Sequence, residues 1–444
     1  MNVLVVGGGA REHAICDAVN RSKDAKLFSV MKNLNPGIAK MSIDYLLEKE
    51  TNVNSVIAYA KAKNIELALI GPEAPLEVGI VDALNENNIR AYAPTKDAAR
   101  IETDKEWMRN LLKKHGVPGQ LRWESFTDIR EARKFIEKLD CEVAIKPIGL
   151  TGGKGVKVAG DHFSTVDEAI AYAKEVIENK IGGTAKVLIE EKAVGEEFTL
   201  QAFSNGNRIF TLPAVQDHKR LLPGDRGPNT GGMGSYSCSN GLLPFLSRKD
   251  YDKATRILQR VVSAMDTEGC TYVGPIYGQF MLTADGPKII EINARFGDPE
   301  NMNVLPLLKT DFIELCNSML DSTSVIKKLD IENKSTVCKY VVPEGYGTKS
   351  MVGKKINVDE NGILDSGARL FYASVNKTND DIVTTSSRSL AVVGIADELS
   401  EAENICEKAL NHVKGDHIFI RHDIGTKDLI EKRISHMNLL RGRQ

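Results

Sequence analysis

The chain has 444 residues, of which 42% are hydrophobic and 27% are charged, a composition typical of a soluble globular protein with several domains. Its 58 basic and 60 acidic residues leave a net charge of −2, which argues against binding to nucleic acid or to an anionic membrane. The seven scattered cysteines show no disulfide or metal-binding spacing, and no signal peptide or run of about 18 apolar residues is recognisable, so we expect a cytoplasmic protein.

The first hundred residues alternate short apolar runs with amphipathic segments. The runs expected to be strands are residues 2–8, 26–31, 66–73 and 89–94, and the segments expected to be helices are residues 11–21, 52–64 and 77–87. Alternation of this kind predicts a parallel sheet with helices on both faces. We therefore predict an open-sheet, Rossmann-like α/β domain over residues 1–104 that binds a substrate.

The loop after the first strand, GGGARE, has the position of a dinucleotide-binding turn but only part of its sequence. Gly7 and Gly9 fit the first two glycine positions, whereas Glu12 stands at the third, which disfavours an NAD-dependent oxidoreductase. A tight turn alone would also explain these glycines. A helix N-terminus with Gly9 and Arg11 at the carboxyl edge of a parallel sheet instead suits a phosphate or a sugar phosphate.

Residues 105–327 begin with a spaced set of cations and glycines. An amphipathic helix is expected over residues 104–118, and residues 142–159 predict a strand, a glycine loop and a second strand. Lys146 ends the first of these strands, where a buried lysine is costly unless it meets an anion. Together with Lys105, this arrangement favours phosphate binding over a solvated loop. The loop residues are Gly152, Gly153, Lys154 and Gly155.

An acidic strand crossing, VLIEEKAVGEEF, follows at residues 187–198. Its carboxylates, Glu190 and Glu197 among them, are separated by an irregular step. Such a crossing can offer backbone groups to an adenine edge and a carboxylate to ribose hydroxyls. The same pattern fits a surface loop with acidic residues, and taken alone it leaves both interpretations open.

The strongest physical pattern is KIIEINARFGD at residues 288–298. Alternation places Glu291, Asn293 and Arg295 on one face of a strand. The turn at residues 283–287 would pair this strand with its predecessor and set Gln279 roughly opposite Glu291. One carboxylate and two amide oxygens beside a guanidinium suit Mg²⁺ or Mn²⁺ shared with nucleotide phosphates. The alternative is a polar strand face with a salt bridge.

A glycine-rich segment, DRGPNTGGMGSY, occupies residues 225–236. A flexible linker is one explanation for it. The other is a loop whose main-chain N–H groups close around an anion.

From about residue 328 the chain carries strand patterns and one helix pattern over residues 400–415. These predict a small α+β domain over residues 328–444. The sequence does not indicate an oligomeric state or what this last domain contacts.

The order of these motifs resembles that of the ATP-grasp ligases and, more narrowly, of the phosphoribosylamine–glycine ligases. The resemblance covers nearly the whole chain and depends on the segments VLVVGGGAREHA, GPEAPL, GLTGGKGV, QDHKR, GPNTGGMGSY, EINARFGDPE and DIG. GPNTGGMG and RFGDPE are highly specific to the narrower family, whereas the glycine loop and the acidic crossing are shared by the wider superfamily. The resemblance implies an ATP-grasp domain over residues 105–327.

The resemblance also implies a nucleotide site. Lys105 and Lys146 would hold the phosphates of ATP, with the loop from Gly152 to Gly155 closing over them. Glu190 and the backbone of Ala193 would frame adenine. Glu197 would bind the ribose hydroxyls.

The resemblance further implies a metal site and a catalytic arginine. Glu291 and Asn293 would bind the divalent ions that bridge the β- and γ-phosphates, with Gln279 as a third ligand. Arg295 would steady the transferring phosphoryl group. The sequence departs from the family pattern at Ile148, where an aspartate is common, and at Gln279, where a small apolar residue is common.

The implied reaction uses ATP to join glycine to 5-phosphoribosylamine, giving glycinamide ribonucleotide, ADP and phosphate in de novo purine biosynthesis. Glycine would first attack the γ-phosphorus to form glycyl phosphate, and the amine would then displace phosphate. The rivals are an ATP-grasp ligase acting on another carboxylate or on bicarbonate, and a non-catalytic nucleotide sensor. The residues expected to bind the substrates are Gly9, Arg11, Asp217, Asn229, Thr230, Gly231 and Gly232.

Overall fold

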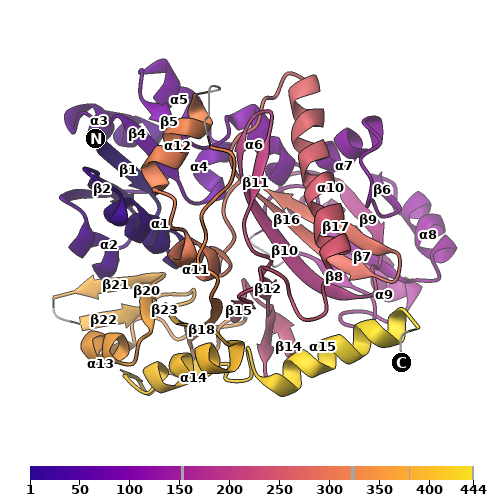
Figure 1. The fold of residues 1–444 in the computed structure, drawn as a ribbon. Helices are drawn as coiled ribbons and strands as arrows, with labels where there is room; N and C mark the ends of the chain where they lie inside the picture. The colour runs from indigo at the N-terminus through magenta and orange to yellow at the C-terminus, as the bar shows by residue number, and fades with distance from the viewer. Residues whose placement is uncertain (152–154, 322–325, 380, 443–444) are drawn as a thin grey trace.

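The computed structural model describes residues 1–444 except 152–154, 322–325, 380 and 443–444. The fold has an N-terminal sheet, two central sheets and a C-terminal sheet, with helices packed around them (Figure 1). This is the mixed α/β and α+β architecture that the sequence predicts.

The N-terminal sheet is parallel, with the strand order β3-β2-β1-β4-β5. Four consecutive residues of β1, Val3 to Val6, are fully buried, so both faces of this sheet are covered, as in doubly wound folds. The sequence analysis missed α2, β3, α4 and α6, which are all short. The strands are β1 (Asn2–Val6), β2 (Lys26–Met31), β3 (Asp44–Leu47), β4 (Leu67–Ile70) and β5 (Arg90–Ala91). The helices are α1 (Ala10–Arg21), α2 (Pro36–Met41), α3 (Val53–Ala62), α4 (Glu73–Glu77), α5 (Ile80–Glu86) and α6 (Lys96–Thr103).

The first central sheet has the order β6-β9-β7-β8 and carries a hydrophobic core of its own. Phe126, Ile136, Val143 and Val187 belong to this core, which is separate from the two larger cores of the molecule. Helix α7 (Lys105–Lys114) precedes the sheet. The strands are β6 (Trp123–Phe126), β7 (Val143–Pro147), β8 (Lys157–Val158) and β9 (Val187–Glu191), and the helices are α8 (Ile129–Lys138) and α9 (Val166–Glu178).

The second central sheet has the order β11-β10-β16-β17. The predicted hairpin register is confirmed, because Gln279 of β16 pairs with Glu291 of β17. Helix α10 (Arg248–Thr267) buries Leu258, Val261 and Val262; its amphipathic pattern is clear, yet the sequence analysis did not include it. The strands are β10 (Glu196–Asn205), β11 (Ile209–Thr211), β16 (Val273–Thr283) and β17 (Gly286–Asn293). The elements that follow are α11 (Asn301–Val304), η1 (Leu305–Leu307) and α12 (Phe312–Leu320).

The C-terminal sheet has the order β12-β15-β18-β23-β20, with β25 also paired to β18. Strands β12 and β15 come from the glycine-rich part of the chain before residue 328, so this segment ties the central region to the last domain. The strands are β12 (Gln216–Asp217), β15 (Gly234–Ser237), β18 (Ser335–Pro343), β20 (Arg369–Tyr372), β23 (Leu390–Ala396) and β25 (Ile418–Ile420).

Two smaller groups of strands and three helices complete the fold. Strands β13 (Arg220–Leu222) and β14 (Arg226–Asn229) form a hairpin. A small sheet has the order β21-β22-β19-β24, built from β19 (Lys355–Val358), β21 (Val375–Thr378), β22 (Asp381–Thr384) and β24 (Val413–Lys414). The helices are α13 (Glu360–Asp365), α14 (Leu399–Leu410) and α15 (Lys427–Leu440).

A buried histidine forms a hydrogen bond between the first and last domains. Because its pKa is shifted, we expect the stability of the protein to depend on pH. The Nδ1 atom of His13 accepts the Tyr372 N–H at 2.8 Å, and burial lowers the histidine pKa from 6.5 to about 4. Between these pH values the unfolded chain binds more protons, so stability is full above pH 6.5 and falls as the pH drops towards 4. We expect a loss of about 3 kcal/mol from this group, measured by urea unfolding at several pH values.

The His13→Gln variant, whose amide oxygen can still accept a hydrogen bond, should show a shallower fall in unfolding free energy between pH 6.5 and 4. His412→Gln, at a half-exposed histidine, is the control and should keep the wild-type slope. Identical slopes in the wild type and the His13 variant would contradict the assignment.

Candidate active site

A cleft of about 610 Å³ is lined by both central sheets and by the N- and C-terminal domains. Strands β7 and β9 contribute Lys146 and Glu190, and β17 contributes Glu291. Arg11 of α1 and Arg388, just before β23, line it from the two outer domains. Residues that the sequence analysis singled out in widely separated segments therefore converge on one cavity.

Two lysines bring positive charge into the cleft from the side of the first central sheet. Lys105 begins α7, and its Nζ donates to the Gly149 carbonyl at 2.9 Å. The Lys146 side chain at the end of β7 is almost fully buried, with its Nζ 2.7 Å from a carboxylate oxygen of Glu190. Burial lowers the Lys105 pKa, against the opposing effect of the Glu291 carboxylate. The Lys105 ammonium is thus held by backbone carbonyls and the Lys146 ammonium by the Glu190 carboxylate.

Glu190 is held between two cations. Arg109 of α7, which is fully buried, places its Nε 2.5 Å from one Glu190 oxygen, while Lys146 contacts the other. Arg109 also donates to the carbonyls of Ile289 and Ile290 in β17, at 3.1 and 3.0 Å. Burial alone would raise the pKa of the Glu190 carboxyl, but the charges of Arg109 and Lys146 hold it below its usual value. The carboxylate therefore orients Lys146.

The oxygen ligands predicted on the hairpin lie together. Asn293 donates from Nδ2 to Glu291 Oε1 at 3.2 Å. Gln279 donates from Nε2 to Glu197 Oε2 at 2.8 Å, and its buried Oε1 has no hydrogen-bond partner within the described residues. Burial would raise the pKa of Glu291, yet the nearby charges, Lys219 first, lower it to about 2. Glu291 is thus a carboxylate at all physiological pH values.

This donor set fits a hard divalent cation. Across the part of the chain that the structure describes, no cluster of three or more His, Cys, Asp or Glu side chains has metal-binding geometry. An ion here would have one carboxylate, amide oxygens and outside ligands such as phosphates. The unpartnered Gln279 oxygen supplies a free ligand of the type that Mg²⁺ and Mn²⁺ prefer.

Arg295, which follows the end of β17, links this strand to the N-terminal domain. Its Nη2 lies 2.8 Å from the Glu102 carboxylate of α6, and its Nε lies 3.3 Å from Glu73 of α4. Burial raises the pKa of Glu102 to about 7, although Arg295 opposes the shift. The guanidinium is therefore fixed at the mouth of the parallel sheet, beside Asn293.

The first glycine loop meets the cleft through Arg11. Arg11 Nη1 donates to the Phe296 carbonyl at 3.2 Å, and its Nε lies 2.7 Å from Glu12. The Glu12 carboxylate accepts the Gly9 N–H at 2.7 Å, so this N–H is already partnered within the turn. Arg11 remains the cation that the N-terminal domain presents to the cleft.

The glycine-rich segment at residues 225–236 is a hydrogen-bonded hairpin and turn, not a structureless linker. Thr230 donates through Oγ1 to the Lys219 carbonyl at 2.8 Å, and the Gly232 N–H returns to that hydroxyl at 3.1 Å. Gly232 has φ +107°, and an added Cβ would lie 2.6 Å from Asp217 Oδ1. Glycine is required here because the backbone passes directly over this carboxylate. Asn229, Thr230 and Gly231 line the cleft.

Asp217 and Glu300 form a second acidic centre next to this turn. The Glu300 carboxylate accepts the Tyr277 hydroxyl at 2.8 Å. The Oδ1 of Asp217 is buried and without a hydrogen-bond partner among the residues described. Burial, together with the Glu300 charge, raises the pKa of Asp217 well above its usual value. Two carboxyl groups therefore lie close together beside the turn.

The remaining predicted contacts lie on the crossing after β9 and in the glycine loop after β7. Ala193 and Glu197 both line the cleft. Gly195 is packed so closely on β16 that an added Cβ would lie 1.9 Å from the Leu282 carbonyl. Gly155 accepts the Tyr172 hydroxyl through its carbonyl at 2.6 Å. The other predicted loop residues, Gly152, Gly153 and Lys154, lie outside the described residues.

The sequence analysis did not identify several charged residues of the site. Lys219 and Glu300 stand inside QDHKR and RFGDPE, which were quoted for the resemblance without a role for either residue. Glu73 likewise stands inside GPEAPL, and no local pattern marks Glu102, Arg109 or Arg388, because their partners are distant in the chain. The missed residues are Glu73, Glu102, Arg109, Lys219, Glu300 and Arg388.

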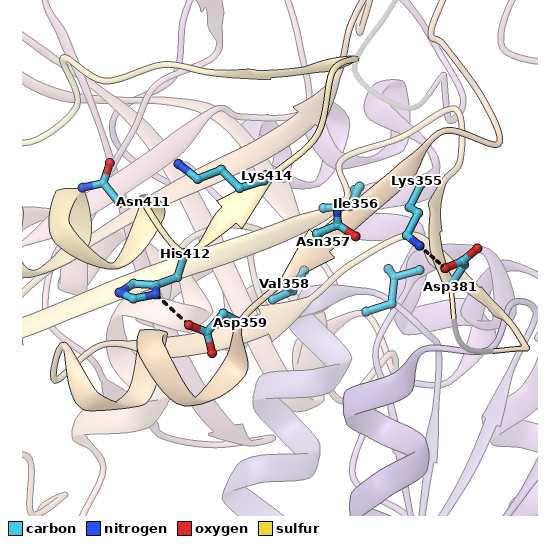
Figure 2. A pocket seen from close by; sticks show the side chains of 10 residues that line it. Lys355, Ile356, Asn357, Val358, Asp359, Asp381, Asn411, His412 and Lys414 are labelled. Atoms are coloured by element: carbon cyan, nitrogen blue, oxygen red, sulfur yellow. Dashed lines mark hydrogen bonds and ion pairs between the residues drawn. The ribbon is translucent and has the colours of Figure 1, made fainter.

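A second hollow of about 540 Å³ lies on the small C-terminal sheet (Figure 2). Its charges pair with each other: His412 points to Asp359 at 2.9 Å and Lys355 to Asp381 at 2.6 Å. These side chains are exposed or half-exposed, so the hollow lacks the buried, converging charges of the main cleft.

Family models match three consecutive parts of the chain. The N domain of phosphoribosylglycinamide synthetase matches residues 1–102, its ATP-grasp (A) domain matches residues 103–301, and its C domain matches residues 336–427. Within the described residues, no helix has the length and apolarity needed to span a membrane.

Curated relatives match this chain over their full length, and those described below are all named phosphoribosylamine–glycine ligase. A phosphoribosylamine–glycine ligase of Methanothermobacter thermautotrophicus is 53% identical over 441 residues, covering 99% of this chain and 100% of the relative. One from Methanocaldococcus jannaschii is 50% identical over 445 residues, with 99% and 100% covered. The crystal structure of the Thermotoga maritima phosphoribosylamine–glycine ligase has a TM-score of 0.81 at 27% identity, covering 95% of this chain and 100% of that one.

Proposed function

The chain belongs to the phosphoribosylamine–glycine ligase family, and we propose how the residues of its cleft divide the family's reaction among them. The protein is an ATP-dependent carboxylate–amine ligase of purine biosynthesis. Its substrates would be ATP, glycine and 5-phosphoribosylamine, and its products glycinamide ribonucleotide, ADP and phosphate. We place it in the cytoplasm, in keeping with its seven free cysteines.

The nucleotide would bind between the two central sheets. Lys105 and Lys146 hold its phosphates, since both ammonium groups are fixed inside the cleft by neighbouring oxygen atoms. Ala193 and the adjoining crossing frame adenine, and Glu197 accepts ribose hydroxyl protons. Glu190 acts mainly through Lys146, because both of its oxygens are already paired.

Mg²⁺ or Mn²⁺ would be held by Glu291, Asn293 and Gln279, together with phosphate oxygens. When bound, such an ion neutralises charge on the β- and γ-phosphates. Arg295 stands next to Asn293 and stabilises negative charge on the transferring phosphoryl group. Glu73 and Glu102 keep the guanidinium in place.

Glycine and the sugar phosphate would enter from the opposite side. Arg11 receives the phosphate of 5-phosphoribosylamine at the mouth of the N-terminal sheet. The turn from Asn229 to Gly232 approaches glycine and, after phosphoryl transfer, glycyl phosphate. Asp217 and Glu300 lie beside the turn and together accept the proton that the attacking amine loses.

The observation that carries this proposal is the convergence of Glu291 with three lysines, which lowers the carboxyl pKa to about 2 in a cleft that also presents unpaired amide oxygen. Such a centre is built for a cation and a polyanion together.

The test is release of ADP in the presence of Mg²⁺, ATP and 5-phosphoribosylamine. We expect release that depends on glycine and forms one glycinamide ribonucleotide for each ADP. Bicarbonate and other amino acids serve as controls and should give only background release. ADP release with bicarbonate, or ATP binding without turnover, would overturn the proposal in favour of another ligase or a nucleotide sensor.

A further inference from the structure

Helix α15 (Lys427–Leu440) begins at the residue where the match to the C-domain family model ends. It leads from the C-terminal domain to the end of the chain on the side of the central sheets (Figure 1). Side chains of α15 and of Arg441, the residue after it, contact three separate parts of the central region.

The first contact is with Glu196, at the start of β10. Both oxygens of this buried carboxylate are paired with α15: Oε2 lies 3.1 Å from Arg433 Nη1, and Oε1 lies 2.6 Å from His436 Nδ1. The next residue along the strand is Glu197, the proposed ribose ligand. Because neighbouring residues of a strand share one backbone, fixing Glu196 also fixes where Glu197 emerges.

The second contact is with the turn of the β13–β14 hairpin. Arg433 Nη2 pairs with the Asp225 carboxylate, and the buried Arg421 holds the other oxygen of that carboxylate at 2.8 Å. Arg433 therefore bridges two carboxylates on two different elements, and all three side chains line the nucleotide cleft. Removing this central cation would leave the two carboxylates short of positive charge and facing each other.

The third contact lies farther along the helix, away from the cleft. Arg441, just after α15, places its Nη1 2.8 Å from Asp250 at the start of α10. Its Nη2 donates to the Thr283 carbonyl at 3.1 Å. This anchor fastens α15 to the second central sheet without touching the residues that line the cleft.

We propose that Arg433 is a positioning residue for ATP: it clamps Glu196 to Asp225 and so fixes the wall of the cleft that frames the nucleoside. The inference rests on the proposed ATP site. Arg433 itself does not take part in phosphoryl transfer. Removal of the clamp therefore weakens nucleotide binding and leaves the binding of glycine intact.

The test compares Arg433→Ala with Arg441→Ala in the full-length protein. Each change removes one arginine of the C-terminal segment together with its contacts, but only Arg433 lines the cleft. For Arg433→Ala we expect the KM for ATP and the Kd of a non-hydrolysable ATP analogue to rise about tenfold, with the KM for glycine within twofold of the wild type. Arg441→Ala should change the KM for ATP by less than twofold.

Two results would overturn the inference: an unchanged KM for ATP in Arg433→Ala, or equal increases in both variants, which would make α15 a general brace. If Arg433→Ala does not fold, Glu196→Gln carries the same test, because it removes the charge that Arg433 clamps and keeps the side-chain shape. Wild-type protein is assayed first. A failure of glycine-dependent ADP release there would refute the proposed function and not the role of Arg433.

Discussion

Replacing Glu291 with glutamine is expected to lower kcat for glycine-dependent ADP release by about 10²- to 10³-fold. Glu291 is the single carboxylate of the proposed metal site, and three lysines already hold it ionised. Glutamine keeps the shape but offers a neutral oxygen, so an ion bridging the phosphates is held less tightly and the lysines lose their counter-charge. The measurement is kcat at saturating glycine over a Mg²⁺ titration.

The control for this change is Glu124→Gln, at an exposed carboxylate on β6. It should keep wild-type kcat and wild-type metal dependence. The Glu291 variant should also need more Mg²⁺ or Mn²⁺ for half-maximal rate. A kcat within fivefold of the wild type, with the same metal requirement, would contradict the assignment.

Replacing Arg109 with methionine is expected to lower the free energy of unfolding by about 3–5 kcal/mol, because it leaves a buried carboxylate with only one of its two cations. Arg109 and Glu190 are both essentially inaccessible to solvent, and Arg109 also binds two carbonyls of β17. Methionine fills similar space, so the loss reports on the charge and its hydrogen bonds and less on a cavity.

Urea unfolding at pH 7 measures this effect. The neighbouring pair supplies a matched control: Arg122, which is mostly exposed, contacts Glu191, the residue after Glu190. Arg122→Met should cost no more than about 1 kcal/mol, as is usual for surface ion pairs. Equal losses in the two variants would show that burial of the Glu190 pair has no special energetic role.

The sequence predicted those parts of the site whose residues lie next to each other in the chain. Alternation along β17 placed Glu291 and Asn293 together, and the turn at residues 283–287 set the partner Gln279 correctly. In the N-terminal domain, repeated strand and helix patterns predicted the parallel sheet. Both inferences rest on local periodicity, which the backbone enforces whatever the rest of the fold does.

Contacts between distant segments could not be predicted in this way. Arg109 and Glu190 are 81 positions apart, and neither carries a local sign of its partner. Arg433 meets Glu196 only because the chain returns from the C-terminal domain to the central sheets. The family resemblance, confirmed by the family models and by relatives at about half identity, identified the cleft but gave no role to these arginines.

Helix α10 was also absent from the predicted elements, although its sequence has a clear helical pattern. Its buried stripe of Ala254, Leu258, Val261 and Met265 follows helical spacing, and Ser247 caps its first turn. The helical spacing of its apolar residues is therefore sufficient to predict α10 from the sequence alone. Strand β3 and helix α2, by contrast, are too short for periodicity to distinguish them from loops.

One measurement tests the central claim most directly: the anomalous scattering of Mn²⁺ in crystals of the protein grown with a non-hydrolysable ATP analogue. The account predicts a manganese peak within bonding distance of a Glu291 carboxylate oxygen and the Asn293 amide oxygen, with phosphate oxygens completing its coordination. A bound analogue whose phosphates carry manganese elsewhere, with no ion on Glu291 or Asn293, would contradict it.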